Sequence, residues 1–255
     1  MTKNIIINID NKIAEITLNR PERMNSITIE LLKELESQLI TINKNEDISV
    51  IILSGKGKAF SAGVDLRQLE ENGTDVSSGG VGKVLDVYAN KVIKLIEESS
   101  KAVISKINGF CYTGGLELAL SADLIYIANE AKLGDTHAVL GFRPSWGLTQ
   151  RLPRYIGIAR AKELSFTAKT ISGIQAKEYG IALDSFPLNE LHEKVYEIAK
   201  NITKNSPNSI KAYKDLYSVA RNKGQVEGLK YESNTQYDIP EVEERVKRFL
   251  KNLKK

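Results

Sequence analysis

The sequence predicts an α/β fold with parallel strands. Short apolar runs, each of a length typical of one buried strand, recur at Val50–Leu53, Ala102–Ile107 and Leu124–Ala128. Amphipathic or small-residue segments typical of helices lie between them, at Val84–Ile96 and Gly114–Ser121. Strands that alternate with helices form units whose strands run parallel, so we expect an α/β core.

The N-terminal part of the chain predicts a hairpin followed by a helix. Two apolar stretches, Ile5–Ile9 and Ile13–Leu18, flank a short polar turn. Thr28 can cap the helix that follows. Apolar residues recur along this helix at helical spacing, namely Leu31, Leu32, Leu35, Leu39 and Ile42.

The rest of the chain divides into a core and a helical region. Residues 57–66 read as a small-residue loop, and the polar, glycine- and serine-rich residues 70–82 as a surface loop. The latter ends in Gly82-Lys83, but Val84 replaces the hydroxyl residue of a phosphate-binding P-loop, which excludes that motif. From Thr149 onward the pattern is almost wholly helical. We predict a core over residues 1–187 and a helical region over residues 188–255.

Composition excludes several classes of protein. The formal net charge of +4 arises from 36 basic and 32 acidic residues, a balance that does not indicate a nucleic-acid partner. Cys111 is the single cysteine, which favours a reducing compartment. The N-terminal residues show no signal-type apolar region, and no apolar stretch is long enough for a membrane span, so we expect a cytoplasmic protein.

A basic C-terminal segment is the exception to the even mixing of charges. Its cations can lie on an exposed helix, or they can meet phosphates of a ligand or of a neighbouring subunit. They are Arg245, Lys247, Arg248, Lys251, Lys254 and Lys255.

Three segments rich in small residues carry the chemistry. They span Ala59–Leu66, Asn108–Ala119, and Leu133–Gly141 with Trp146–Pro153, and we call them the first, second and third small-residue segments. In the second, Gly114-Gly115 opens a helix, whose first N–H groups have no internal partner and attract negative charge. Glu117 follows within one turn and can act as an acid or a base.

Gly114, Gly115 and Glu117 also allow a purely structural interpretation, but the first small-residue segment makes that interpretation less favoured. Gly114-Gly115 can simply allow close packing, and Glu117 can simply offset the helix dipole. However, Val64 in the first segment can supply a second N–H to the same oxygen. Two such donors form an oxyanion hole, which is often the largest single contribution to catalysis.

Together these motifs resemble the crotonase, or enoyl-CoA hydratase/isomerase, superfamily. The resemblance runs from Ile5 to Phe186 and rests on five motifs in the right order. They are Ile16–Pro21 with Met24-Asn25, Ala59–Leu66, Gly114–Ala119, Thr149–Pro153, and Gly157 with Ala161 and Ser172–Gly180.

The resemblance implies a spiral of strand–strand–helix turns with a C-terminal helical trimerisation region. It implies a homotrimer or a dimer of trimers. The ligand would be an acyl-CoA thioester, with coenzyme A as part of the substrate and no separate cofactor. Val64 and Gly114 would form the oxyanion hole, and Glu117 would be the first catalytic glutamate. Substrate contacts would come from Ala62, Asp65, Leu66, Gly115 and Trp146.

The sequence departs from the family pattern at His137, which stands where hydratases carry a second glutamate. Three cases are open. His137 serves as the second acid/base or orients the water, since imidazole has a suitable pKa. Glu117 works alone, as one base can when it moves a double bond. Alternatively, hydration is lost and the chain only binds acyl-CoA or runs another enolate reaction.

Several side chains near this position also allow structural interpretations. His137 can be a hydrogen-bonded structural residue, and Asp135, two positions earlier, can substitute as the carboxylate. Trp146, Phe142 and Tyr112 can line an acyl pocket or pack in the core. No metal site is indicated, because the two histidines lie far apart and no Cys/His ligand spacing exists.

The leading hypothesis is an enoyl-CoA hydratase that uses a two-amide oxyanion hole and Glu117. Isomerisation, hydrolysis, decarboxylation or another reaction through a CoA-thioester enolate is the alternative within the same fold. An acyl-CoA binding protein without turnover is the alternative from another class.

Overall fold

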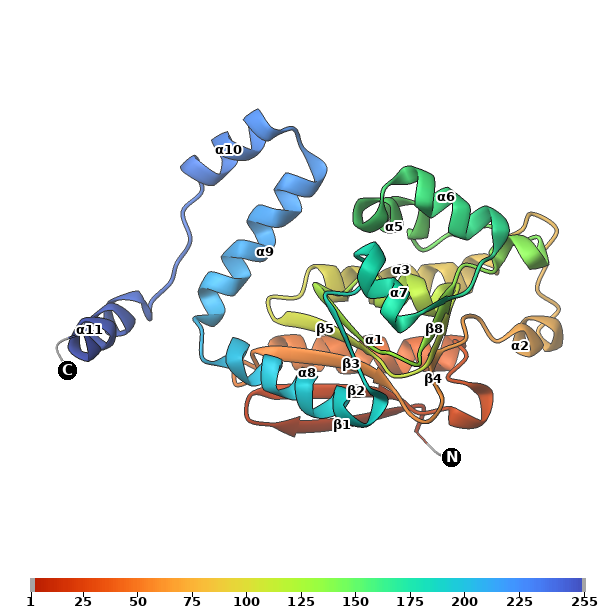
Figure 1. Ribbon diagram of the computed structural model, residues 1–255, viewed down its shortest axis with the longest axis horizontal. Helices are drawn as coiled ribbons and strands as arrows, with labels where there is room; N and C mark the ends of the chain where they lie inside the picture. Colours follow the sequence, from red (N-terminus) through yellow and green to blue (C-terminus); the bar gives the residue numbers. More distant parts are fainter. Residues whose placement is uncertain (1–2, 254–255) are drawn as a thin grey trace.

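The computed structural model describes residues 3–253 and contains two sheets. The larger has the strand order β1-β2-β3-β5-β7-β10 (Figure 1). β1 and β2 form the antiparallel hairpin, and from β2 onward each neighbouring pair is parallel, which confirms the predicted parallel core. The strands are β1 (Ile5–Asp10), β2 (Ile13–Leu18), β3 (Val50–Gly55), β5 (Ala102–Ile107), β7 (Leu124–Ala128) and β10 (Asp184–Phe186).

The smaller sheet, in the order β4-β6-β8-β9, lies where the sequence pattern indicated loops and links. That interpretation was wrong, because strands of two or three residues are too short to show a period of two. With them, each turn of the chain is strand–strand–helix, as the crotonase-type spiral requires. The strands are β4 (Ala59–Ser61), β6 (Phe110–Tyr112), β8 (Lys132–Gly134) and β9 (Ile171–Ser172).

Helices α1 (Ile29–Lys44) and α3 (Lys83–Glu97) pack against each other beside the larger sheet (Figure 1). The Thr28 hydroxyl caps α1 by accepting a hydrogen bond from the Leu31 amide at 3.2 Å, as predicted. All six residues of β5 are buried, so both faces of the sheet are covered there.

The remaining helices lie around this core. Short helices follow β4, β6 and β9, and longer ones follow β8 and β10. They are α2 (Leu66–Glu71), α4 (Gly114–Ala119), α5 (Leu148–Ile156), α6 (Ile158–Thr167), α7 (Gly173–Tyr179) and α8 (Leu188–Thr203). Two 3₁₀ turns, η1 (Pro21–Arg23) and η2 (His137–Leu140), precede α1 and α5.

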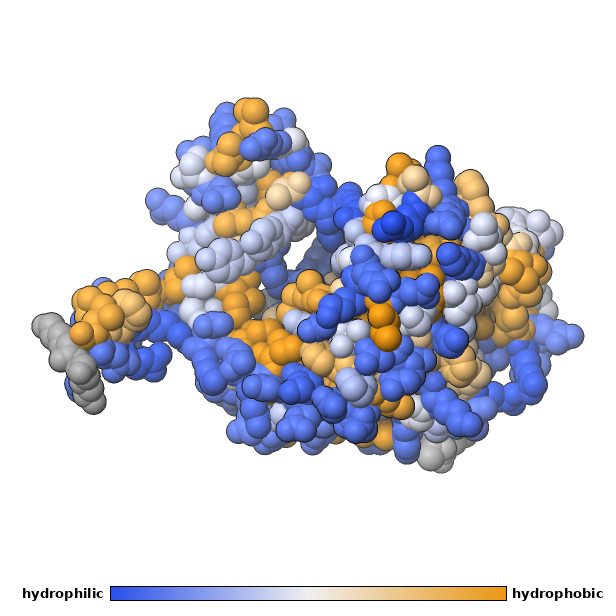
Figure 2. Space-filling view, viewed as in Figure 1, coloured by the Kyte–Doolittle hydropathy of each residue, from blue (hydrophilic) through white to orange (hydrophobic). Residues whose placement is uncertain are grey.

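The last three helices form an arm that leaves the core. They are α9 (Pro207–Asn222), α10 (Gln225–Asn234) and α11 (Val242–Asn252), and we call them the C-terminal arm. Figure 1 shows the arm projecting to one side, whereas α8 packs on the larger sheet. Neither α10 nor α11 has a buried residue, and Figure 2 shows apolar side chains at the arm's surface.

The C-terminal part of the chain contains the predicted domain division and the basic segment. The division at residue 188 stays a prediction, since α8 begins there but packs on the core. Lys254 and Lys255 of the basic segment lie outside the described residues. Within residues 3–253, no helix is long and apolar enough to cross a membrane.

Candidate active site

The first and second small-residue segments contact each other through glycines. A Cβ atom on Gly63 would lie 2.0 Å from Oγ1 of Thr113. One on Gly115 would lie 2.4 Å from the carbonyl oxygen of Ser61. Glycine at these positions therefore lets the end of β4 approach the start of α4 at backbone distance. This contact brings the neighbourhoods of Val64 and Gly114 together.

The backbone around Val64 is held by residue 27, which leaves the Val64 N–H free. The Ile27 amide donates to the Gly63 carbonyl at 2.7 Å, and the Asp65 amide donates to the Ile27 carbonyl at 3.0 Å. The N–H groups of Val64 and Gly114 donate to no protein acceptor within residues 3–253. Two free amides on touching segments can bind one oxygen atom.

Thr113 sets the direction in which α4 begins. Its backbone has φ 45° and ψ −116°, a conformation that is strained for a residue with a side chain. Its N–H donates to the Gly134 carbonyl at 3.1 Å, and its carbonyl accepts from the Glu117 amide at 2.9 Å. The second and third segments are thus joined at the residue before Gly114.

Glu117 is buried, with 1% of its surface exposed, and one of its oxygens is fixed. Oε1 accepts hydrogen bonds from the amides of Trp146 at 2.9 Å and Leu148 at 3.0 Å. Oε2 lies 3.8 Å from Nε2 of His137. Burial raises the pKa of the carboxyl and outweighs the two amides and His137, which lower it. A raised pKa favours the protonated form of the carboxyl, which can act as an acid.

His137 and Asp135 form a hydrogen-bonded pair beside Glu117. Nδ1 of His137 lies 2.6 Å from Oδ1 of Asp135, and the His137 amide donates to the same oxygen at 3.2 Å. Burial alone would raise the pKa of Asp135, but the hydrogen bonds from His137 and Ser165 outweigh it and lower that pKa. The structure therefore brings together three titratable residues that the sequence singled out.

Trp146 is packed rather than exposed. Its side chain is buried against Gly114, where a Cβ atom would lie 2.4 Å from Cζ3 of the indole. The indole Nε1 donates to Oδ1 of Asp86 at 2.8 Å, and Arg151 donates to the Trp146 carbonyl at 2.6 Å. Asp86 was missed by sequence reasoning, because on an amphipathic helix it resembles any solvated acid.

The other predicted substrate contacts have structural partners of their own. Asp65 forms an ion pair with Arg20 at 2.9 Å, and the Ala62 amide donates to the Met24 carbonyl at 3.0 Å. Leu66 begins α2 and is 44% exposed. Substrate contact by these residues, and by Gly115 and Trp146, stays a prediction.

The N-terminal motif is also explained by its contacts with the first segment. Asn25 is fully buried, and its amide nitrogen donates to the carbonyls of Lys56 at 3.0 Å and Ala59 at 2.7 Å. Its amide oxygen accepts from the Arg20 backbone N–H at 2.8 Å. Asn25 thereby holds the strand that leads to Val64.

Comparison with known proteins agrees with this fold and site. The family model described as enoyl-CoA hydratase/isomerase matches residues 8–254, so the chain belongs to that family. It is 34% identical over 212 residues to a short-chain-enoyl-CoA hydratase of Clostridium acetobutylicum, covering 83% of this chain and 79% of the relative.

Two further matches have different names. A peroxisomal Δ(3,5)-Δ(2,4)-dienoyl-CoA isomerase of Arabidopsis thaliana is 33% identical, covering 88% of this chain and 84% of that one. The crystal structure of an enoyl-CoA hydratase from Bacillus anthracis has a TM-score of 0.85 and 37% identity, covering 90% of this chain and 88% of that chain. The crotonase-type fold is therefore shown, and the names of the relatives include both hydratases and isomerases.

Proposed function

We propose that this protein is an enoyl-CoA hydratase that acts on short acyl chains. The observation that carries the proposal is the buried Glu117 carboxyl, one turn from the free Gly114 amide and 3.8 Å from His137. Relatives named short-chain-enoyl-CoA hydratase and crotonyl-CoA hydratase, each 34% identical, support the substrate class.

The reaction follows from the chemistry of the thioester. The carbonyl oxygen of the substrate accepts hydrogen bonds from the N–H groups of Val64 and Gly114. These donors stabilise the negative charge that reaches this oxygen when water adds to Cβ and an enolate forms. Glu117 then delivers a proton to Cα. Coenzyme A is the carrier of the acyl group and takes no part in the bond changes.

Isomerisation is the second candidate, favoured by the dienoyl-CoA isomerase relative. A single carboxylate can remove a proton from one carbon and return it to another. In that case His137 would have a structural role only. The two reactions share the oxyanion hole and differ in whether water is incorporated.

A substrate panel separates these activities. Crotonyl-CoA and a 3-enoyl-CoA are incubated with the protein in D₂O, and the products are measured by mass spectrometry. A hydratase converts crotonyl-CoA to a 3-hydroxyacyl-CoA with one deuterium at Cα. Conversion of the 3-enoyl substrate alone favours the isomerase, and release of free coenzyme A favours hydrolysis. Binding of both substrates without a product contradicts the proposal and favours a non-catalytic acyl-CoA binder.

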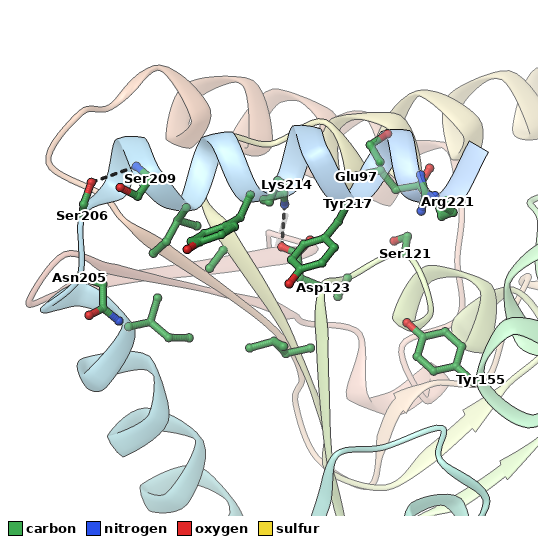
Figure 3. A pocket seen from close by; sticks show the side chains of 17 residues that line it. Glu97, Ser121, Asp123, Tyr155, Asn205, Ser206, Ser209, Lys214, Tyr217 and Arg221 are labelled. Atoms are coloured by element: carbon green, nitrogen blue, oxygen red, sulfur yellow. Dashed lines mark hydrogen bonds and ion pairs between the residues drawn. The ribbon is translucent and has the colours of Figure 1, made fainter. Parts of the chain in front are cut away.

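We also propose that the chain assembles as a homotrimer or a dimer of trimers through the C-terminal arm. A groove of about 780 Å³ runs between the core and α9 (Figure 3). It is lined by aromatic and aliphatic side chains such as Tyr155, Ile210 and Tyr217, together with charged ones such as Asp123 and Arg221. Glu117 does not line it, so we assign the groove to a neighbouring copy rather than to the substrate.

Exposed apolar residues continue from this groove along the arm. Tyr217 is 71% exposed and Val226 is 82% exposed, which is costly for an isolated chain. Light scattering should give the mass of three or six chains, and the mass of one chain would contradict the proposal. A cytoplasmic location stays a prediction.

A further inference from the structure

Asp135 accepts two hydrogen bonds on one oxygen from the same residue. Its Oδ1 meets the ring Nδ1 of His137 at 2.6 Å and the His137 amide at 3.2 Å. Both residues are buried, and Asp135 is the more deeply buried of the two. An ionised carboxylate can only accept hydrogen bonds, so Nδ1 must carry the proton.

The position of that proton decides what the other ring nitrogen can do. In a neutral imidazole with hydrogen on Nδ1, Nε2 has a free lone pair. This Nε2 faces Oε2 of Glu117 at 3.8 Å, which is too long for a direct hydrogen bond. A water oxygen placed beside the line between the two atoms can lie about 2.8 Å from both.

We propose that Asp135 is a positioning residue that holds His137 in the Nδ1–H tautomer, so that Nε2 takes the proton from the attacking water. The inference rests on the proposed hydratase function. It divides the work between two different groups: His137 acts as the base toward water, and Glu117 acts as the acid toward Cα.

The bond changes balance without a further reactant. One O–H bond of water breaks as its oxygen bonds to Cβ, and the proton goes to Nε2 of His137. The electron pair of the double bond moves to the thioester oxygen, then returns as Cα takes the proton from Oε2 of Glu117. After the product leaves, the proton on Nε2 passes through a water to Oε2, which restores the site.

The opposite tautomer conflicts with the geometry. A proton on Nε2 alone would leave a lone pair on Nδ1 facing the carboxylate oxygen at 2.6 Å. It would also aim a donor at the water and remove the acceptor that the water needs. Asp135→Ala removes the acceptor that holds the proton on Nδ1, so the ring is free to adopt the Nε2–H tautomer, whereas Asn could offer its own oxygen to both donors.

Nitrogen NMR of the histidine rings tests the tautomer without any turnover. The chain has two histidines, so ¹⁵N-histidine labelling in a His192→Gln background leaves the ring of His137 alone. We expect a proton on Nδ1 and none on Nε2, and a shift toward Nε2–H in Asp135→Ala. A proton on Nε2 in the protein with native Asp135, whether neutral or as imidazolium, overturns the proposal. Because this readout needs no product, it is independent of the proposed hydratase activity.

Kinetics test whether the tautomer matters for hydration. Asp135→Ala should lower kcat about 10²- to 10⁴-fold with little change in KM, as loss of the correct tautomer does elsewhere. In a His137→Glu background, which replaces the imidazole by a carboxylate, the same change should cause no further loss. An equal loss in both backgrounds would mean that Asp135 acts only on the fold, and no loss in the native background would also overturn the proposal.

Discussion

Two glutamates in this protein, one partly and one fully buried, have pKa values shifted in opposite directions. The side chains of Glu15 and Glu117 are 13% and 2% exposed. Burial raises the pKa of Glu15, but Lys106, whose Nζ lies 2.6 Å from Oε1, reverses this and lowers it overall. At Glu117, burial prevails, because its partners are neutral amides and a histidine. Of these two carboxyls, burial raises the net pKa only of the one that no lysine faces.

The two sites differ because of where they lie in the spiral. Glu15 is on β2, and Lys106 is on β5, with Ser54 of β3 between them. Ser54 also donates a hydrogen bond to Glu15 at 2.9 Å. Parallel strands thus gather a complete ion pair on one face of the sheet. Glu117 instead lies in the first turn of α4 and faces the backbone amides of Trp146 and Leu148 at the start of α5.

The largest expected effect is a loss of hydratase activity when Glu117, but not Glu15, is replaced by glutamine. Glu117→Gln removes the proton that Cα receives, so hydration of crotonyl-CoA should fall about 10²- to 10⁴-fold. Glu15→Gln is the matched control and should keep kcat within about twofold, since it lies outside the site. Steady-state kinetics on both variants measure this. Equal losses of kcat in the two variants would contradict the assignment of Glu117, and not Glu15, to the active site.

The second prediction concerns stability as a function of pH. The folded pKa of Glu117 is raised above its ordinary value of 4.5, so its ionisation destabilises the fold as pH rises from 4.5 through the raised pKa. Glu117→Gln should lack that loss. The folded pKa of Glu15 is lowered, so its stabilisation is present above 4.5 and is lost as pH falls through the lowered pKa.

Urea unfolding over a pH series checks these two windows. The stability difference between native protein and Glu117→Gln should change above pH 4.5, and the difference for Glu15→Gln should change below it. If both stability differences changed over the same pH range, the pKa values of the two carboxyls would be shifted in the same direction, which would contradict the prediction.

The smallest effect concerns the second histidine. His192 lies 3.8 Å from Oε2 of Glu15 and 2.9 Å from Lys106, but its side chain is 65% exposed. His192→Gln should therefore change the free energy of unfolding by no more than about 0.5 kcal/mol and leave kcat unchanged. A larger loss in urea unfolding would mean that Lys106 alone does not explain the environment of Glu15.

The main elements of the fold follow from local patterns in the sequence. Apolar runs such as Val50–Leu53 predicted the central strands, and Thr28 predicted the start of α1. The short strands of the second sheet were not predicted, because β4 and its neighbours form only when the larger sheet has placed them side by side. Pairing over three residues leaves no periodic signal.

The sequence by itself determined that Gly114 and Glu117 are one turn apart, and the family resemblance predicted that His137 replaces a second glutamate. Only the tertiary structure decided how they work together. The amides of Trp146 and Leu148 hold one oxygen of Glu117, and Asp135 holds the ring of His137. Partners thirty residues apart, such as Glu117 and its amides, leave no local pattern, because their distance depends on how the whole spiral packs.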